Sequence, residues 1–311
     1  MGWYVMGVDL GSTTAKAVIV DQDGGLAGSS VVQMGAVSRD AVLRAMDHAL
    51  TSARIGRDSI RHTISTGYGR KLVPGADRSF TEITCHARGA AALHPGVRLV
   101  IDIGGQDSKV IAVDSDGLVD RFAMNDRCAS GTGRFFDVLA RALEVDVNNV
   151  GDLALSGAEG LEVSSMCATF AETEVISMLA QGREKSDIAA SVHKAVAART
   201  LGLLAQVGKA TPTVMTGGVA QNAAARHYIE KALRHPIDVL AQPQIAGAYG
   251  AGLLARDEYA GSVSSAESRD AKAKEQLSVR AAGIVPQCAG CDGTAGDHNH
   301  VSVPLTLRRK S

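Results

Sequence analysis

The sequence has almost no excess of charge: 32 Lys and Arg stand against 33 Asp and Glu over 311 residues. No run of Lys or Arg occurs in the first 256 residues, so the basic field that nucleic-acid binding usually needs is absent. No stretch approaches about 18 uninterrupted apolar residues, the length of a membrane-spanning helix. The start lacks the basic and apolar segments of a secretory signal. We therefore expect a cytoplasmic protein with no nucleic-acid partner and no membrane contact.

Cysteine is scarce, and a Walker phosphate loop is missing. The five cysteines of a cytoplasmic protein stay reduced, so we expect them to be buried, catalytic or metal-bound rather than paired in disulfides. The pattern G-x-x-x-x-G-K-[ST] does not occur, which excludes a Walker-type nucleotide site. The remaining composition, 45% hydrophobic and 21% charged, is typical of a globular protein, and the length allows two lobes with a substantial core.

What the chain does contain is an internal repeat. Residues 8–24 are matched by residues 101–117 at one constant offset and without a gap. Each copy predicts a strand that ends in Asp, a turn of small residues, a second strand with a Lys, and an Asp-Gly turn. The chain is therefore predicted to contain a duplicated unit. The matched pairs are Asp9 and Asp102, Gly11 and Gly104, Lys16 and Lys109, Asp21 and Asp114, Asp23 and Asp116, and Gly24 and Gly117.

Strand meanders alternate with helices along the chain, which predicts an α/β protein with mixed sheets. The predicted strands cover residues 4–9, 15–20, 26–33, 60–65, 97–103, 109–113, 118–124, 213–216 and 237–240. The predicted helices are one with Ser38 as its N-cap and those near 134–144, 169–181, 186–207, 222–233 and 246–256.

Three parts are expected along the chain. Residues 1–96 are predicted to form a first lobe, completed by the helix at 246–256, and residues 97–245 a second lobe. After about Tyr259 the composition changes to Gly, Ser, Ala and scattered charge without an apolar period. We therefore expect residues 257–311 to form a flexible tail.

Two glycine-rich turns predict a phosphate site. Glycine lacks a Cβ atom, so the N–H groups of such a turn approach phosphate oxygens closely. Asp9 and Asp102 suit hydrated Mg²⁺, Lys16 suits the terminal phosphates, and Gln106 and Asp107 suit the orientation of an attacking water. One Asp-x-Gly alone could be ordinary turn chemistry, but two matched copies favour a phosphate clamp. The turn residues are Gly11, Ser12, Thr13 and Thr14 in one copy and Gly104, Gly105, Gln106 and Asp107 in the other.

A third glycine-rich element follows a predicted strand at Met215–Asn222. Gly217, Gly218 and Gln221 offer a flat backbone surface for an adenosine ring. Together with the two turns, this element resembles the superfamily of acetate and sugar kinases, heat-shock chaperones and actin. The resemblance implies a duplicated, ribonuclease-H-like fold with ATP in the cleft between two lobes.

Two cysteines, Cys128 and Cys167, each precede a predicted helix. Helix N-termini stabilise negative charge, so each thiolate is favoured there. A 4Fe-4S cluster usually takes four cysteine thiolates, and a dimer of chains with two each would supply them across its twofold axis. The alternative from the residues alone is a pair of buried core cysteines.

Six segments resemble the ATPase components of benzoyl-CoA reductases and the activators of 2-hydroxyacyl-CoA dehydratases, the BadF/BadG/BcrA/BcrD type. The resemblance covers residues 4–256. It implies that Cys128 and Cys167 bind one 4Fe-4S cluster shared between two subunits and that each cleft binds MgATP. The segments are Thr66–Arg70, Cys85–Ala90, Ile101–Asp107, Asn125–Cys128, Phe170–Glu174 and Met215–Asn222.

This resemblance implies an ATP-dependent electron-transfer component. Ferredoxin or flavodoxin would donate the electron, and the catalytic component of an acyl-CoA reductase or dehydratase would accept it. The sequence of residues 81–89 favours the benzoyl-CoA reductase branch, and a 2-hydroxyacyl-CoA dehydratase activator is the alternative. The protein is expected to form a homodimer or a heterodimer with a similar ATPase subunit. A small-molecule kinase that uses the same cleft is the alternative from another class.

The remaining sulfur and imidazole groups have lesser roles in this interpretation. Cys85 is expected in the core or at an interface. A zinc site in the tail is a minor alternative, because its spacing departs from common zinc patterns. Its four candidate ligands are Cys288, Cys291, His298 and His300, whereas His48, His62, His86 and His193 are expected to be surface or structural histidines.

Overall fold

A computed structural model describes residues 2–35, 37–126, 128–163 and 168–281. Cys167 and the tail residues Cys288, Cys291, His298 and His300 lie outside the described residues. Both sheets belong to the compact unit that ends at Ser262. The division into lobes at residues 96 and 245 stays a prediction.

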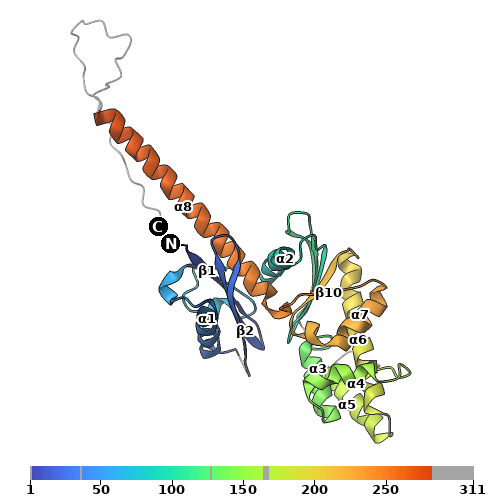
Figure 1. Cartoon of the computed structure of the whole chain (residues 1–311). Helices are drawn as coiled ribbons and strands as arrows, with labels where there is room; N and C mark the ends of the chain where they lie inside the picture. The colour runs from blue at the N-terminus through green and yellow to red at the C-terminus, as the bar shows by residue number, and fades with distance from the viewer. Residues whose placement is uncertain (1, 36, 127, 164–167, 282–311) are drawn as a thin grey trace, which may run out of the picture. The chain divides into compact units, whose positions relative to one another are not determined.

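The first sheet has the strand order β3-β2-β1-β4-β5, and its strands β1 and β2 are labelled in Figure 1. β1 is central and buried on both faces, in keeping with its continuous apolar sequence. Helix α1, Arg39–Ala53, begins at the predicted N-cap, where the Ser38 side chain accepts a hydrogen bond from the N–H of Ala41. It packs its apolar stripe on β2 and β3. The strands are β1 Tyr4–Leu10, β2 Thr14–Asp21, β3 Leu26–Gln33, β4 Ile60–Thr66 and β5 Arg78–Ser79.

The second sheet repeats this topology with the order β8-β7-β6-β9-β10. Asp9 lies opposite Lys16 in the β1–β2 pair, and Asp102 lies opposite Lys109 in the β6–β7 pair. The predicted duplication is therefore confirmed at the level of strand register. The strands are β6 Leu99–Ile103, β7 Ser108–Val113, β8 Val119–Asn125, β9 Thr213–Thr216 and β10 Asp238–Val239.

The repeat extends further than the sequence comparison indicated. Thr66 and Thr216 end equivalent strands and lie opposite Asp9 and Asp102. Each is followed by a glycine with positive φ, 89° at Gly67 and 85° at Gly217. A side chain on either glycine would collide with the backbone of the neighbouring hairpin. Both halves thus place a glycine directly beside the aspartate.

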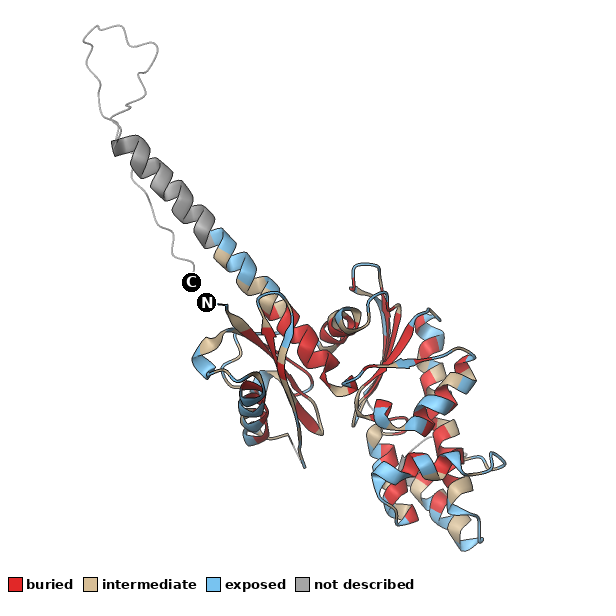
Figure 2. Cartoon of the chain, in the orientation of Figure 1, coloured by how far each residue is buried: buried red, intermediate tan, exposed pale blue. Residues whose placement is uncertain are grey.

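The second half is longer because it contains an additional group of helices between its third and fourth strands. Twice as many residues separate Asp102 from Thr216 as separate Asp9 from Thr66. These helices and β6 to β9 share one apolar core (Figure 2). α6 is the single described helix that is long and apolar enough to cross a membrane, and over half of its apolar window is buried in this core. The helices are α3 Gly133–Leu143, α4 Val150–Leu155, α5 Ala168–Ala180 and α6 Lys185–Val207, followed by α7 Ala223–Leu233.

Two further helices cross at a contact between glycines. α2, Glu82–Leu93, packs on the second sheet, whereas α8, Ala246–Ala281, packs on the first. A Cβ on Gly89 would overlap the carbonyl oxygen of Ala246, and a Cβ on Gly250 would overlap that of Cys85. The two backbones are therefore in direct contact, which only glycine allows.

Several elements differ from the prediction. α8 does not end near residue 256 but continues to Ala281, because the added residues are rich in the helix formers Ala, Glu, Lys and Arg although they lack an apolar stripe. α2, α4 and β5 were not predicted. Five short 3₁₀ segments complete the described chain: Arg57–Ser59, Arg70–Leu72, Val147–Asn149, Gly218–Gln221 and Pro243–Ile245.

Candidate functional site

The two glycine-rich turns close their hairpins in the same way. The N–H of Gly11 donates to the carbonyl oxygen of Thr14 at 3.0 Å, and the N–H of Gly104 donates to that of Asp107 at 2.9 Å. The turns also approach each other, since a Cβ on Gly105 would collide with the Thr13 side chain. The predicted phosphate turns are thus brought together, and Gly105 is required by this approach.

The two aspartate–lysine pairs have the same geometry but different surroundings. Lys16 Nζ lies 3.1 Å from Asp9 Oδ2, and Lys109 Nζ lies 3.1 Å from Asp102 Oδ2. The Lys16 side chain is 14% exposed, whereas that of Lys109 is only 2% exposed. Lys109 Nζ also lies 2.9 Å from an oxygen of Asp107 and 3.5 Å from one of a further carboxylate, that of Glu82. Three carboxylates therefore surround one buried ammonium group.

Electrostatics in this network follow from its burial. Burial alone would raise the pKa of Asp102, but His86, Lys109 and the Thr216 hydroxyl outweigh it and hold the pKa well below its ordinary value. Burial alone would lower the pKa of Lys109, yet its carboxylate neighbours raise it. Both groups are consequently charged at neutral pH. Burial raises the pKa of Glu82, and Lys109 opposes this only in part.

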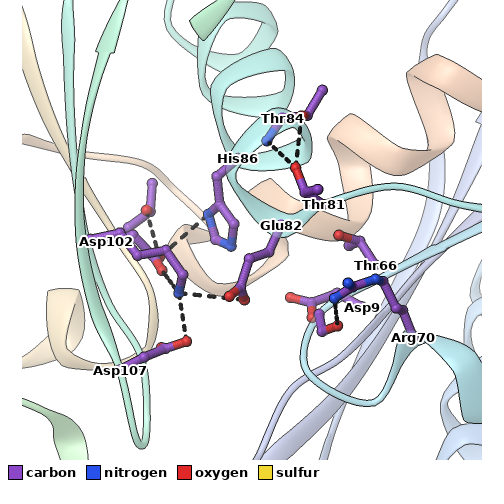
Figure 3. Close-up of polar contacts among 12 residues, drawn as sticks. Asp9, Thr66, Arg70, Thr81, Glu82, Thr84, His86, Asp102 and Asp107 are labelled. Carbon is purple, nitrogen blue, oxygen red and sulfur yellow. Dashed lines mark hydrogen bonds and ion pairs between the residues drawn. The ribbon is translucent and has the colours of Figure 1, made fainter. Parts of the chain in front are cut away.

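Helix α2 adds Glu82, which the sequence analysis did not assign to the site, and His86, which it expected to be a surface or structural histidine. Glu82 and His86 lie one turn apart on α2 and extend towards Asp102 and Asp9 (Figure 3). His86 Nδ1 lies 3.4 Å from Asp102 Oδ1, an oxygen that also accepts a 2.8 Å hydrogen bond from Thr216.

A local signal for this helix was present in the sequence. The Thr81 side chain accepts a hydrogen bond from the N–H of Thr84 as the N-cap, and Ile83, Ala87 and Ala90 follow at helical spacing. The interpretation of His86 as an ordinary structural histidine is therefore incomplete.

The third glycine-rich element has the predicted strand–turn–helix form. β9 ends at Thr216, Gly217 makes the positive-φ turn, and the 3₁₀ segment that begins at Gly218 follows. Gln221 Nε2 donates to Gln244 Oε1 at 3.4 Å. The Asn222 side chain caps α7 by accepting from the N–H of Ala225. These side-chain contacts position the turn between β9 and α7, and its role as a surface for adenosine stays a prediction.

The segment that bears Cys128 is held by Asn125, the last residue of β8. Asn125 Nδ2 donates to the carbonyl oxygens of Cys128 at 2.8 Å and Ser130 at 3.4 Å, and Asn125 Oδ1 accepts from the N–H of Cys128 at 3.3 Å. In strand register, Asn125 lies opposite Ser108, the residue that follows the second phosphate turn. Asn125 therefore connects this turn to the cysteine.

Helix α3 makes a second connection. Its first N–H groups, those of Gly133 and Arg134, donate to the carbonyl oxygens of Gly104 and Gly105, each at 2.8 Å. These two N–H groups are occupied by the glycine-rich turn, and the expectation that the start of α3 stabilises the Cys128 thiolate stays a prediction.

The described cysteines differ in environment. Cys85 is fully buried, as expected for a core residue, and burial raises the pKa of its thiol to about 12. Cys128 is partly exposed. Within the part of the chain that the structure describes, no group of three or more His, Cys, Asp or Glu side chains is arranged to hold a metal ion.

Two sheets of identical topology, matched turns at their hairpins and a glycine-rich third element define a two-lobe protein of the ribonuclease-H-like class. A ROK family glucokinase from Streptomyces griseus shares this fold at a TM-score of 0.51 and 17% identity, with 82% of this chain and 99% of that chain covered. The likeness is one of fold alone.

Within this class, the chain belongs to the BadF/BadG/BcrA/BcrD ATPase family, whose model matches residues 6–255. It is 42% identical over 256 residues to the (R)-2-hydroxyglutaryl-CoA dehydratase activating ATPase of Acidaminococcus fermentans, covering 82% of this chain and 98% of the relative. The solved activator of the 2-hydroxyisocaproyl-CoA dehydratase from Clostridium difficile, with bound ADPNP, is 38% identical at a TM-score of 0.80. That match covers 84% of this chain and 97% of the activator chain.

The preference for the benzoyl-CoA reductase branch is not supported by these identities. A benzoyl-CoA reductase subunit from Thauera aromatica is 31% identical over 219 residues, covering 69% of this chain and 77% of the relative. The identity over the whole matched length, 42% to the activating ATPase and 31% to the reductase subunit, favours the dehydratase activators over the short 81–89 segment on which the preference rested.

Proposed function

We propose that this protein is the ATP-dependent electron-transfer activator of a 2-hydroxyacyl-CoA dehydratase. The observation that carries the proposal is the pair of hydrogen bonds from the start of α3 to Gly104 and Gly105. These bonds connect a phosphate turn to the segment of Cys128, so an event at the nucleotide reaches the cysteine through the backbone. The similarity to dehydratase activators supports this branch.

MgATP is the substrate in this proposal. Hydrated Mg²⁺ binds beside Asp9 and Asp102, and the two glycine-rich turns, 11–14 and 104–107, cradle the phosphates. Lys16 is the more exposed lysine of the two ion pairs, so it is the one that contacts the terminal phosphates. The third glycine-rich element supports the adenosine through Gly217, Gly218 and Gln221.

Cys128 fits the role of a cluster ligand. Cys128 is a partly buried residue, whereas the fully buried Cys85 thiol is held neutral by its raised pKa, and thiolates are the ligands of iron–sulfur clusters. Cys167 is the second ligand proposed from the sequence. A partner copy of the chain, or a similar ATPase subunit, supplies the other two. When bound, the 4Fe-4S cluster supplies a one-electron carrier of low potential.

The coupling itself depends on residues of this chain. The first turn of α3 follows Gly104 and Gly105 when the phosphate turn adjusts to the nucleotide. Asn125, which pairs with Ser108 of β7, holds the Cys128 backbone through its side chain. A shift of this segment changes the hydrogen bonds around the thiolate, which alters a cluster's potential. In the cytoplasm, ferredoxin or flavodoxin donates the electron and the dehydratase component accepts it.

Anaerobic purification and reconstitution with iron and sulfide test the proposal. We expect a brown dimer with a 4Fe-4S spectrum that hydrolyses ATP and activates a 2-hydroxyacyl-CoA dehydratase component. Cys128→Ala should lose the cluster, whereas the matched control Cys85→Ala should retain it. A colourless wild-type protein that phosphorylates a small metabolite would instead identify a kinase, and an intact cluster in Cys128→Ala would exclude the ligand assignment.

A further inference from the structure

The presence of His86 in the site follows neither from the duplication nor from the two aspartate–lysine pairs. His86 is only 5% exposed, and its Nδ1 makes no hydrogen bond although it lies 3.4 Å from Asp102 Oδ1. Buried polar atoms are nearly always hydrogen-bonded, so an exception in a polar site needs a reason. The carboxylate of Asp102 can only accept, and it therefore favours the tautomer with the proton on Nδ1.

The other ring nitrogen of His86 faces the first sheet. A Cβ on Gly247 would stand 2.8 Å from His86 Nε2 and 3.1 Å from Asp9 Oδ2. Both atoms therefore lie beside the Gly247 backbone and at most about 6 Å from each other, a separation that a single water molecule can bridge. In its neutral form, with the proton on Nδ1, the ring presents Nε2 as an acceptor that can receive a hydrogen bond from that water. Figure 3 draws the ion pair of His86 with Asp102, and a water between His86 and Asp9 would connect the two equivalent aspartates of the duplication.

The two residues expected to orient the water are placed less favourably. Asp107 is held by Lys109, with 2.9 Å between Oδ2 and Nζ. Gln106 is exposed at the tip of its turn. His86 is buried, carried by a helix rather than a turn, and aligned by Asp102, which suits a group that must hold one orientation.

We propose that His86 orients the water molecule that attacks the γ-phosphate of ATP, an inference that rests on the proposed ATPase function. The water oxygen forms a new bond to the γ-phosphorus while the bond from that phosphorus to the β,γ-bridging oxygen breaks. The electron pair of the broken bond leaves with ADP, and the water proton is released with inorganic phosphate. His86 accepts a hydrogen bond in this step and is not consumed.

Steady-state phosphate release and binding of a non-hydrolysable ATP analogue to the full-length protein test this role. For His86→Leu we expect kcat to fall by about 100-fold, because the water loses its orientation, while the Kd of the analogue changes by less than about threefold. His86→Gln, which keeps a hydrogen-bonding group, should recover part of the loss. Analogue binding also shows that each variant is folded.

The control is His94→Leu. His94 follows the last residue of α2 and also has a buried Nδ1 without a hydrogen bond, but it pairs with Asp238 rather than with the site. We expect no change in kcat for this variant. If the wild type hydrolyses ATP and both His86 variants retain its kcat, His86 has no such role. If the wild type itself does not hydrolyse ATP, the proposed function fails instead.

Discussion

The N–H of Gly133 donates a 2.8 Å hydrogen bond to the carbonyl oxygen of Gly104. Gly133 is the first residue of α3, which follows the Cys128 segment, and Gly104 begins the second phosphate turn. A Cβ on Gly133 would stand 3.1 Å from the same oxygen. Among the described residues, no helix donates to the equivalent turn of the first half in this way, because the additional helices belong only to the second half. The second glycine-rich turn and the Cys128 segment are therefore connected in one half of the duplicated core.

Asn125→Ala should loosen the Cys128 segment. The variant loses the side-chain bonds to the backbone of Cys128 and Ser130, worth about 1 kcal/mol each. In the cluster-free protein, we expect modification of the Cys128 thiol to accelerate by about tenfold, measured by mass spectrometry after timed alkylation. Asn148→Ala removes a comparable side-chain bond in an exposed turn and should leave the rate unchanged. Equal alkylation rates in both variants would argue against a role of the Asn125 side chain in holding the Cys128 segment.

The two lysines of the duplication should differ in their contribution to stability. Lys109→Met leaves three carboxylates around a side chain without charge. Loss of a buried ion partner lowers the free energy of unfolding by about 3 to 5 kcal/mol. Lys16→Met leaves one carboxylate, that of Asp9, without its partner beside a more exposed lysine position and should cost less, about 1 to 3 kcal/mol. Urea titrations measure the free energy of unfolding of both variants. A larger loss for Lys16→Met than for Lys109→Met would contradict the prediction.

Stability should fall in mild acid because of His193. The ring is buried, and burial lowers its pKa. Its Nε2 lies 3.0 Å from Asn222 Nδ2. The unfolded chain therefore binds a proton at His193 more readily than the folded protein does. The contribution of the neutral His193 ring to the free energy of unfolding is present above the unfolded pKa of about 6.5 and is lost as the pH falls below it. Urea midpoints should decrease from about pH 7.5 to about pH 5.5, and the decrease should be smaller in His193→Gln.

Two glycine-to-alanine substitutions in helices should act in opposite directions. A Cβ on Gly250 of α8 would overlap the carbonyl oxygen of Cys85 where α2 and α8 cross, so Gly250→Ala should destabilise by about 1 to 3 kcal/mol or more. Gly202 of α6 has no neighbour within 4 Å of its Cβ position. Gly202→Ala should stabilise by about 0.5 to 1 kcal/mol. Thermal midpoints measure both, and similar midpoints would contradict the close helix crossing.

The fold class and the repeat could be predicted from the sequence because their signals are local. A strand, a small-residue turn and a second strand with a fixed Asp–Lys spacing recur in residues 8–24 and 101–117, and register follows directly from such a hairpin. The N-cap at Ser38 and the strand that ends at Thr216 are equally local. In contrast, the extension of α8 was missed because it has helix propensity without the apolar period used to detect helices.

The sequence alone determined that two matched aspartates, two matched lysines and two glycine-rich turns exist, and that a pair of cysteines follows the second copy. Only the tertiary structure decided that the pairs are unequal. α2 leaves the first sheet and packs on the second, and this long-range contact brings Glu82 to Lys109 and His86 to Asp102. The Lys109–Asp102 pair is more deeply buried than the Lys16–Asp9 pair and therefore has more charged neighbours, because a charge removed from water must be paired locally. No pattern within either copy contains that information.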